Sequence, residues 1–95
     1  MECSRILFSG HAVRRMFERA ISQEDVAHLA LDGEVIARYP DDSPFPSYLI
    51  LAFVEGTALH AVVARDVATG DCHIVTVYVP DPLQWEPNFR TRRQQ

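Results

Sequence analysis

The stretch YLILAFVEGTALHAVVAR, residues 48–65, decides the fold class. It contains two apolar runs, 48–54 and 58–65, which are separated by Glu55-Gly56-Thr57. A short apolar run bounded by a turn signal is typical of a covered β-strand, and the central glycine favours a tight turn. Because strands joined so closely have to be antiparallel neighbours, the stretch predicts a β-hairpin within a sheet.

Further strands are expected on both sides of this hairpin. Residues 34–39 alternate weakly, with Val35, Ala37 and Tyr39 expected on one face. Residues 72–79 form another apolar run, and it ends at Pro80, which cannot continue a ladder. The sequence therefore predicts an antiparallel sheet of about four strands. These strands are residues 34–39, 48–54, 58–65 and 72–79, and residues 5–8 form either a short first strand or a lead-in.

Two helices are expected before the strands. Residues 10–20 carry apolar side chains on one arc and charged ones on the other, with Ser9 as the N-cap. A second helix follows Ser22, which starts a capping-box-like pattern, and Gly33 is expected to be its C′ residue. The fold class is therefore α+β, with two N-terminal helices packed on the sheet. The apolar arc of the first helix consists of Ala12, Val13, Met16, Phe17 and Ala20.

Length and composition indicate one domain. The chain has 95 residues, of which 47% are hydrophobic and 23% charged, as in ordinary globular proteins. We expect a single domain over residues 1–95, with a core over about 5–89 and a basic flexible tail at 90–95. The longest apolar run is too short to span a membrane, and no signal peptide is expected. Cys3 and Cys72 are expected to be unpaired thiols, which predicts a cytoplasmic protein.

The charge distribution excludes a protein that coats nucleic acid with its whole surface, because such binding needs many cationic contacts. The chain contains nine arginines, no lysine and 13 acidic residues, for a net charge of −4. Most of the arginines are concentrated in two places, which leaves room for a local anion site. They are Arg14, Arg15 and Arg19 in the first helix, and Arg90, Arg92 and Arg93 in the tail.

One candidate site lies on the first helix. His11, Arg15 and Arg19 stand at i, i+4 and i+8, so their side chains lie one above another. An imidazole beside guanidinium groups suits phosphoryl chemistry, in which histidine moves a proton and arginine stabilises the developing charge. The same spacing equally fits a solvated helix face that carries an Arg14–Glu18 pair.

Other candidates lie on the strands and in the tail. His60 and Tyr78 form a polar patch if the register places them on one sheet face; otherwise His60 is a hydrogen-bonded sheet histidine. The tail arginines form either a disordered end or an RNA or partner contact. No spacing fits zinc, and Asp41-Asp42 offers too few oxygens for a hard cation, so neither metal nor cofactor is expected. Within 72–79, the residues Ile74, Thr76 and Tyr78 are expected to share one face.

The order of several short motifs resembles a prokaryotic domain-of-unknown-function family, the one numbered forty-two fifty-eight. The opening motif is His-x3-Arg-Met-x-Glu-Arg-x-Ile-Ser, which begins at His11 and ends at Ser22. The likeness covers about residues 11–89. The later matching pieces are Gly33-Glu34-Val35-Ile36, Tyr39-Pro40-Asp41-Asp42, Pro46-Ser47, Leu59-His60-Ala61-Val62-Val63, Thr76-Val77-Tyr78, Pro80-Asp81-Pro82 and Trp85.

The resemblance extends distantly to the RelE/ParE toxins, in which helices pack on an antiparallel sheet, and it implies two alternative functions. One is a metal-independent RNase of a toxin–antitoxin-like module, with a small zinc-finger antitoxin as partner. In that case His11 or His60 is the acid or base, Arg15 and Arg19 stabilise charge, and Tyr78 stacks on a base or relays a proton. The other is a non-catalytic protein-interaction module. A homodimer formed through an exposed strand edge is a further expectation.

Overall fold

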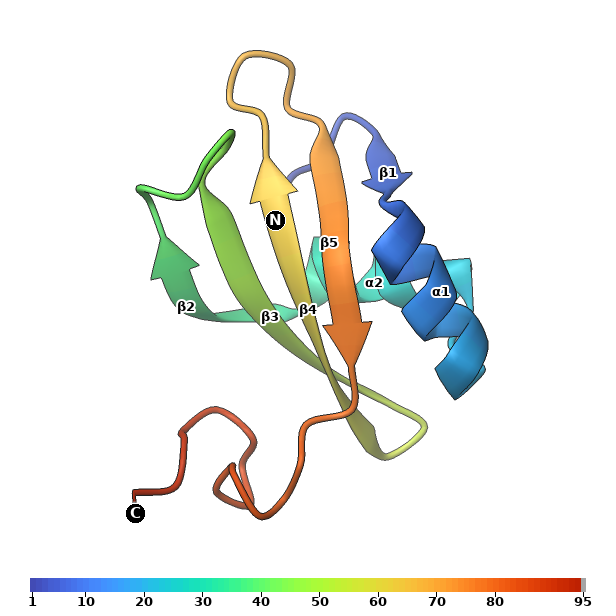
Figure 1. Ribbon diagram of the computed structural model, residues 1–95, viewed down its shortest axis with the longest axis vertical. Coiled ribbons are helices and arrows are strands. Elements are labelled where there is room, and N and C mark those ends of the chain that lie inside the picture. Colours follow the sequence, from blue (N-terminus) through green and yellow to red (C-terminus); the bar gives the residue numbers. More distant parts are fainter. Residues whose placement is uncertain (95) are drawn as a thin grey trace.

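A computed structural model of the chain describes residues 1–94, which form two helices and a five-stranded sheet (Figure 1). The strand order is β1-β5-β4-β3-β2. The α+β class and the β3–β4 hairpin are confirmed. The elements are β1 (Ile6–Phe8), α1 (Gly10–Arg19), α2 (Gln23–Asp32), β2 (Glu34–Tyr39), β3 (Ser47–Val54), β4 (Thr57–Arg65) and β5 (Cys72–Tyr78).

The expectation of about four antiparallel strands was wrong, because β1 adds a fifth strand and pairs with β5 in parallel. The sheet is therefore mixed. Only Ile6–Phe8 take part in this pairing, and Ser9 then turns the chain into α1. The strand is so short that the sequence pattern alone did not distinguish it from a lead-in.

Both helices begin where their capping residues predict. The Ser9 hydroxyl accepts a hydrogen bond from the Ala12 amide, and the Ser22 hydroxyl accepts one from the Asp25 amide. Each cap of this kind contributes about 1 kcal/mol to helix stability. Gly33 differs from expectation, since its backbone is extended (φ −71°) rather than left-handed. A glycine is needed there for space, because a Cβ would overlap the Leu29 carbonyl oxygen.

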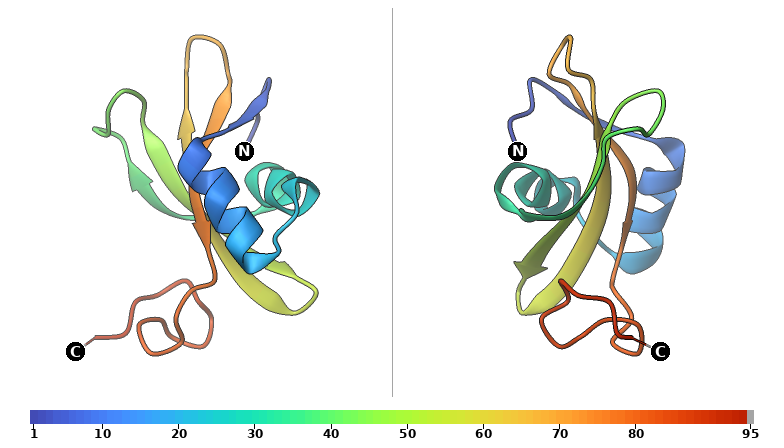
Figure 2. Two further views of the ribbon diagram at one scale, coloured as in Figure 1. Left: turned by 45° about the vertical axis from the view of Figure 1, so that its right-hand side comes forward. Right: turned by 90° about the vertical axis from the view of Figure 1, so that its left-hand side faces the viewer.

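The helix α1 buries a narrower arc than expected. Ala12 and Met16 are buried, but Val13 is 47% exposed and Phe17 is 87% exposed. The reason is the position of α1, which packs along β5 at the edge of the sheet while α2 covers β3 and β4 (Figures 1 and 2). A helix at an edge contacts the strands with only part of its circumference, so the rest of its apolar arc faces solvent.

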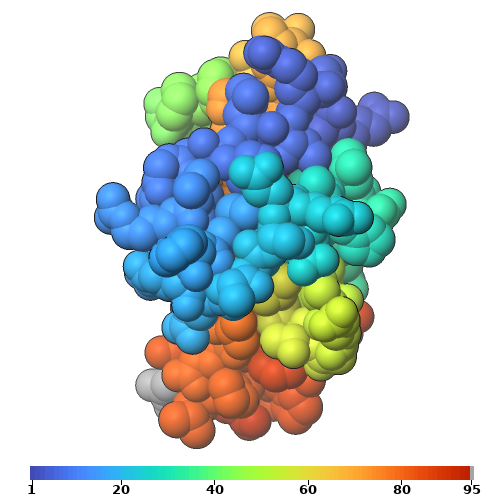
Figure 3. Space-filling model, turned by 90° about the vertical axis from the view of Figure 1, so that its right-hand side faces the viewer, coloured from blue at the N-terminus to red at the C-terminus, as the bar shows by residue number. Residues whose placement is uncertain are grey.

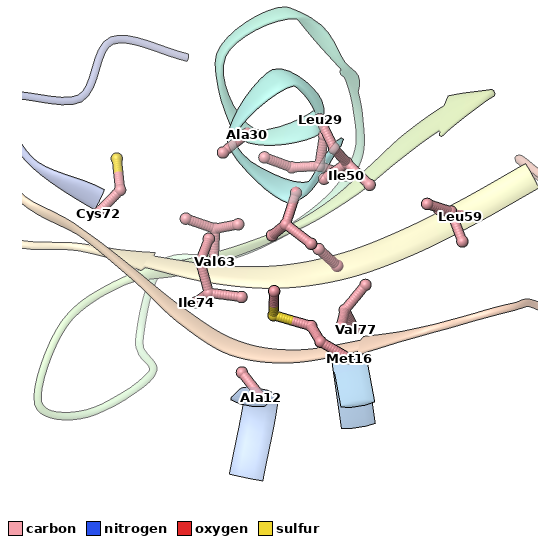
Figure 4. Close-up of a cluster of buried hydrophobic side chains, with 12 residues drawn as sticks. Ala12, Met16, Leu29, Ala30, Ile50, Leu59, Val63, Cys72, Ile74 and Val77 are labelled. Carbon is pink, nitrogen blue, oxygen red and sulfur yellow. The ribbon is translucent and has the colours of Figure 1, made fainter. Parts of the chain in front are cut away.

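One hydrophobic core joins the two helices to the sheet. In Figure 4, side chains from α1 and α2 are directed toward the strands β4 and β5 that run between the helices. Leu29, Ile50 and Ile74 are fully buried, and each such side chain contributes about 1.5–3 kcal/mol through burial. The described residues of this core are Ala12, Met16, Val26, Leu29, Ala30, Ile50, Leu59, Ala61, Val63, Cys72, Ile74 and Val77.

Two β-bulges change which side chains face the core. In β5 the pairing shifts between Val63↔Ile74 and Val62↔Thr76, so Ile74 faces the core while Thr76 and Tyr78 face away. The expectation that these three residues share one face was therefore wrong. A second shift between Val35 and Ala37 in β2 has the same effect, since Val35 packs on the core while Ala37 and Tyr39 line pockets on the far face. The extra residue of a bulge re-aims the side chains that follow it.

The expectation of two unpaired thiols was also wrong, because Cys3 and Cys72 form a disulfide. The two residues are far apart in sequence, but β1 lies beside β5 and brings them together. The same N-terminal segment is held by a second contact, in which the Arg5 guanidinium donates hydrogen bonds to the Asp71 carboxylate at 2.7 and 3.2 Å. These bonds lower the pKa of Asp71.

The C-terminal segment, residues 80–93, also makes specific contacts, which differs from the expected flexible tail. Arg90 pairs with Glu34 at 2.8 Å, and Trp85 forms a backbone bridge with Arg92. The Arg93 side chain donates to the carbonyl of Pro82. The tail's last residue, Gln95, lies outside the described residues. Within residues 1–94, no helix is both long and apolar enough to cross a membrane.

Breaking the Cys3–Cys72 bond should destabilise the protein, because the disulfide closes a loop with a sequence separation of 69 residues. We expect the Cys3→Ser, Cys72→Ser double variant to lose about 2–4 kcal/mol of unfolding free energy. Urea denaturation followed by circular dichroism measures this loss. Dithiothreitol should lower the wild-type midpoint to that of the variant and leave the variant unchanged; an unchanged wild-type midpoint would contradict the bond.

Candidate functional site

The sheet face that points away from α2, called the open face here, carries two adjoining pockets. Their volumes are about 680 and 310 Å³, and both are lined by Tyr39 and Val62. The cross-strand register places His60 beside Tyr78 and Val62 beside Thr76 on this face. Figure 2 shows α2 on one side of the curved sheet. The open face is therefore the surface on which a ligand would meet the polar side chains of β4 and β5.

His60 lies at the centre of the open face and has no exposed surface. Its Nε2 lies 2.8 Å from the Phe89 carbonyl oxygen, and its Nδ1 lies 3.2 Å from the Tyr78 hydroxyl. Because a carbonyl only accepts, Nε2 carries the proton and Nδ1 accepts from Tyr78. Burial lowers the pKa of His60, and the bond to Phe89 opposes this. His60 is thus a neutral, fully bonded side chain.

Tyr78 is half-buried beside His60, and the two rings meet edge to face. Burial raises the pKa of the Tyr78 phenol, the nearby Tyr39 raises it further, and Arg92 opposes both. Tyr78 therefore keeps its proton at neutral pH and can donate it in a hydrogen bond. Tyr39, Tyr78 and Arg92 all line the smaller pocket.

His11 reaches the same face from the start of α1. Its Nε2 lies 3.0 Å from the Thr76 hydroxyl oxygen, and the ring is exposed to solvent. Thr76 and Tyr78 point to the same side of β5, and residues two apart on a strand are separated by about 7 Å. Three of the predicted site residues, His11, His60 and Tyr78, therefore share one face of the sheet.

The arginines of the C-terminal segment differ in their surroundings. Arg90 and Arg93 are paired with Glu34 and Glu86. Arg92 instead places its guanidinium carbon 5.2 Å from the centre of the Trp85 ring. Arg90, Arg92 and Trp85 line the smaller pocket. The segment thus brings positive charge to the open face.

The helix arginines do not gather at this pocket. Arg15 pairs with Glu18 at 3.5 Å, where an Arg14–Glu18 pair was the expectation, and Arg14 is exposed. Arg19 lines a separate pocket near Asp25, at the end of α1. The structure therefore leaves only His11 of the helix cluster in contact with the open face.

Sequence reasoning missed Tyr39, which lines both pockets, and assigned no role in the site to Trp85. Tyr39 was expected beside Val35 because the bulge in β2 carries no clear sequence signal. Trp85 carried an available signal, because tryptophan is enriched at interfaces where part of the ring is buried and its N–H reaches a polar partner. Among residues 1–94, no three His, Cys, Asp or Glu side chains are grouped in a way that could hold a metal ion.

Comparison with known proteins gives one match. The sequence profile of the family described as "Domain of unknown function (DUF4258)" matches residues 8–79. No curated protein and no solved structure matches the chain. The matched range contains everything from α1 to β5, whereas Trp85 and Arg92 follow it. Because the match covers most of the chain, this protein belongs to the DUF4258 family of domains of unknown function.

Proposed function

We propose that this protein is a toxin-like endoribonuclease that holds single-stranded RNA on its open face. The observation that carries the proposal is the pocket in which Tyr39, Tyr78 and Arg92 meet. Aromatic rings and guanidinium groups are the side chains on which unpaired bases stack and to which phosphates bind. A distant relationship to the RelE/ParE toxins is part of this proposal, and the two helices packed against antiparallel strands support it.

The proposed reaction uses the RNA 2′-hydroxyl as nucleophile, so no metal-activated water is required. His11 takes the 2′-hydroxyl proton, and the oxygen attacks the adjacent phosphorus to form a 2′,3′-cyclic phosphate. On substrate binding the Tyr78 hydroxyl turns its proton from His60 Nδ1 to the leaving 5′-oxygen, and Arg92 stabilises the charge on the phosphate oxygens. His60 has no free ring nitrogen, so its role is to position Tyr78. Arg15 and Arg19 are proposed to add positive charge along α1, beside the open face.

The first prediction of this proposal concerns RNA cleavage. The purified protein should cut single-stranded RNA and leave a 2′,3′-cyclic phosphate and a 5′-hydroxyl, and its expression should arrest bacterial growth. His11→Ala and Tyr78→Phe should each lower the cleavage rate about 10²–10⁴-fold, because each removes a proton-transfer group. Gel analysis of end-labelled RNA measures both rate and product ends.

Two matched variants serve as controls. His28→Ala removes an exposed histidine of α2, and Tyr48→Phe removes a hydroxyl from the core-facing side of β3, so neither should change the rate. A substrate with 2′-deoxy nucleotides should resist cleavage, because it lacks the nucleophile. Normal growth with accumulated wild-type protein, or equal cleavage of the deoxy substrate, would contradict the proposal.

The second prediction tests whether His60 is held neutral in the folded protein. The folded protein holds His60 neutral with a lowered pKa, whereas the unfolded chain takes up a proton near pH 6.5. The unfolding free energy should therefore fall as the pH drops below about 6.5, until the folded-state pKa is reached. His60→Gln should flatten this dependence, whereas His28→Gln should leave it intact. Urea denaturation at several pH values tests it, and an unchanged slope in His60→Gln would contradict the assignment.

The cytoplasm is the proposed location, because RNA substrates are present there. Disulfides are uncommon in that compartment, so the thiol form of Cys3 and Cys72 is the relevant one for RNA cleavage. The cleavage assay should accordingly be run both with and without dithiothreitol. Cleavage confined to the oxidised protein would contradict a cytoplasmic site of action.

A second candidate function, binding of another protein through α1, is favoured by the exposure of Phe17 and Val13. These side chains stand at i and i+4, so they lie together on the outer side of the helix. Figure 3 shows α1 and α2 side by side on one surface of the molecule. The proposed partner is a small zinc-finger antitoxin, and a homodimer is the alternative.

The third prediction tests this surface. Phe17→Asp should abolish co-purification of the antitoxin-like partner from the native host, whereas His11→Ala should not affect it. Because Phe17 is 87% exposed, the change should alter the unfolding free energy by no more than about 0.5 kcal/mol. Sedimentation of the purified chain separates the alternatives, since a dimer that dissociates in Phe17→Asp would support self-association instead. An unaffected partner complex would contradict a role for α1.

A further inference from the structure

The smaller pocket on the open face has the features of a site for one nucleotide. Its volume of about 310 Å³ is at the lower end of the range for small-molecule sites. Leu49 and Val62 provide an apolar floor, and Tyr39 and Tyr78 provide aromatic walls. Such a lining suits a planar ring that is buried on its faces and polar at its edges.

Arg92 gives the same pocket a positively charged group held in a fixed orientation. Its guanidinium lies over the Trp85 ring, and the backbones of the two residues are bridged. Trp85 is itself only 6% exposed and packs edge to face on His60 at 4.5 Å between ring centres. This stack limits the freedom of the Arg92 side chain, and Arg92 nevertheless remains exposed to solvent. A guanidinium held in this way is prepared for bidentate contact with a phosphate.

Arg92 also differs from Arg90 and Arg93 in its ion pairing. Within residues 1–94, Arg90 and Arg93 each have an acidic partner, but Arg92 forms no ion pair. An anion bound at Arg92 would therefore not have to displace a carboxylate. Tyr78 keeps its proton beside it, so its hydroxyl does not repel a phosphate.

We infer that this pocket binds a single nucleoside monophosphate unit, with the base against Tyr39 and Tyr78 and the phosphate on Arg92. The inference rests on the proposed function, because that unit would be one nucleotide of the RNA. It also assigns a role to residues 80–93, since Trp85 and Arg92 follow the range matched by the family profile.

Titration of the full chain with guanosine and adenosine 5′-monophosphates tests the inference. Trp85 is the only tryptophan, so its fluorescence reports on this pocket, and calorimetry measures the affinity independently. We expect saturable binding of both nucleotides, with weaker binding of the unphosphorylated nucleosides and of ribose 5-phosphate. Comparable affinity for inorganic phosphate would overturn the inference, because the site would then bind any small anion.

Variants distinguish the part of the site that holds the base from the part that holds the phosphate. Arg92→Ala should weaken nucleotide binding by about tenfold or more but leave nucleoside binding little changed, since only the phosphate contact is lost. Arg92→Lys should restore part of the affinity. Tyr39→Ala should weaken the binding of both nucleotide and nucleoside. Leu83→Ala changes an exposed residue of the segment that contains Arg92, and it should weaken the binding of neither ligand. Equal losses for nucleotide and nucleoside in Arg92→Ala would contradict the assigned phosphate contact.

The outcomes for this site and for RNA cleavage are separable. Nucleotide binding without RNA cleavage supports the site and contradicts the endoribonuclease. RNA cleavage together with no nucleotide binding supports the endoribonuclease activity and contradicts the site; if Arg92→Ala also leaves the cleavage rate unchanged, Arg92 has no part in the reaction.

Discussion

The hydrogen bonds of His60 organise the whole open face. One ring nitrogen donates to the Phe89 carbonyl and so fastens the C-terminal segment to the sheet, while the other accepts from Tyr78 and orients its phenol. The ring also supports Trp85, on which Arg92 rests. A buried polar group costs free energy unless it is hydrogen-bonded, and here both nitrogens are satisfied. The side chains of the pocket are therefore coupled through one imidazole that never contacts the ligand in our proposal.

Much of the fold follows from patterns that local physics explains. The serine caps, the helical period of residues 10–20 and the short turn between β3 and β4 predicted the helices and the central hairpin correctly. Each of these signals depends on residues close together in sequence. The pairing of β1 with β5 and the disulfide depend on contacts between distant segments, and three strand residues and two isolated cysteines contain no information about such partners.

The site was less predictable than the fold, and the reason lies in the two bulges. Strict alternation places Tyr39 with Val35 and Tyr78 with Ile74, on the side of the core. One extra residue in each strand moves both tyrosines to the open face. The same limitation applies to the helix cluster: spacing correctly aligned His11 with Arg15, but only the packing of α1 at the edge of the sheet shows that His11 reaches Thr76. The positive charge at the smaller pocket comes from two arginines, Arg90 and Arg92.

The division of the pocket between the family domain and the C-terminal segment has an evolutionary consequence. The tyrosine walls belong to strands within residues 8–79, whereas Trp85 and Arg92 belong to the C-terminal segment, which packs on the sheet and buries Pro80 and Trp85. A related chain could replace that segment with another of similar length and acquire a new ligand preference, provided that the new segment supplied an acceptor for the His60 ring and covered it as Trp85 does. In our proposal, recognition can therefore diversify through this segment while the helices and strands stay the same.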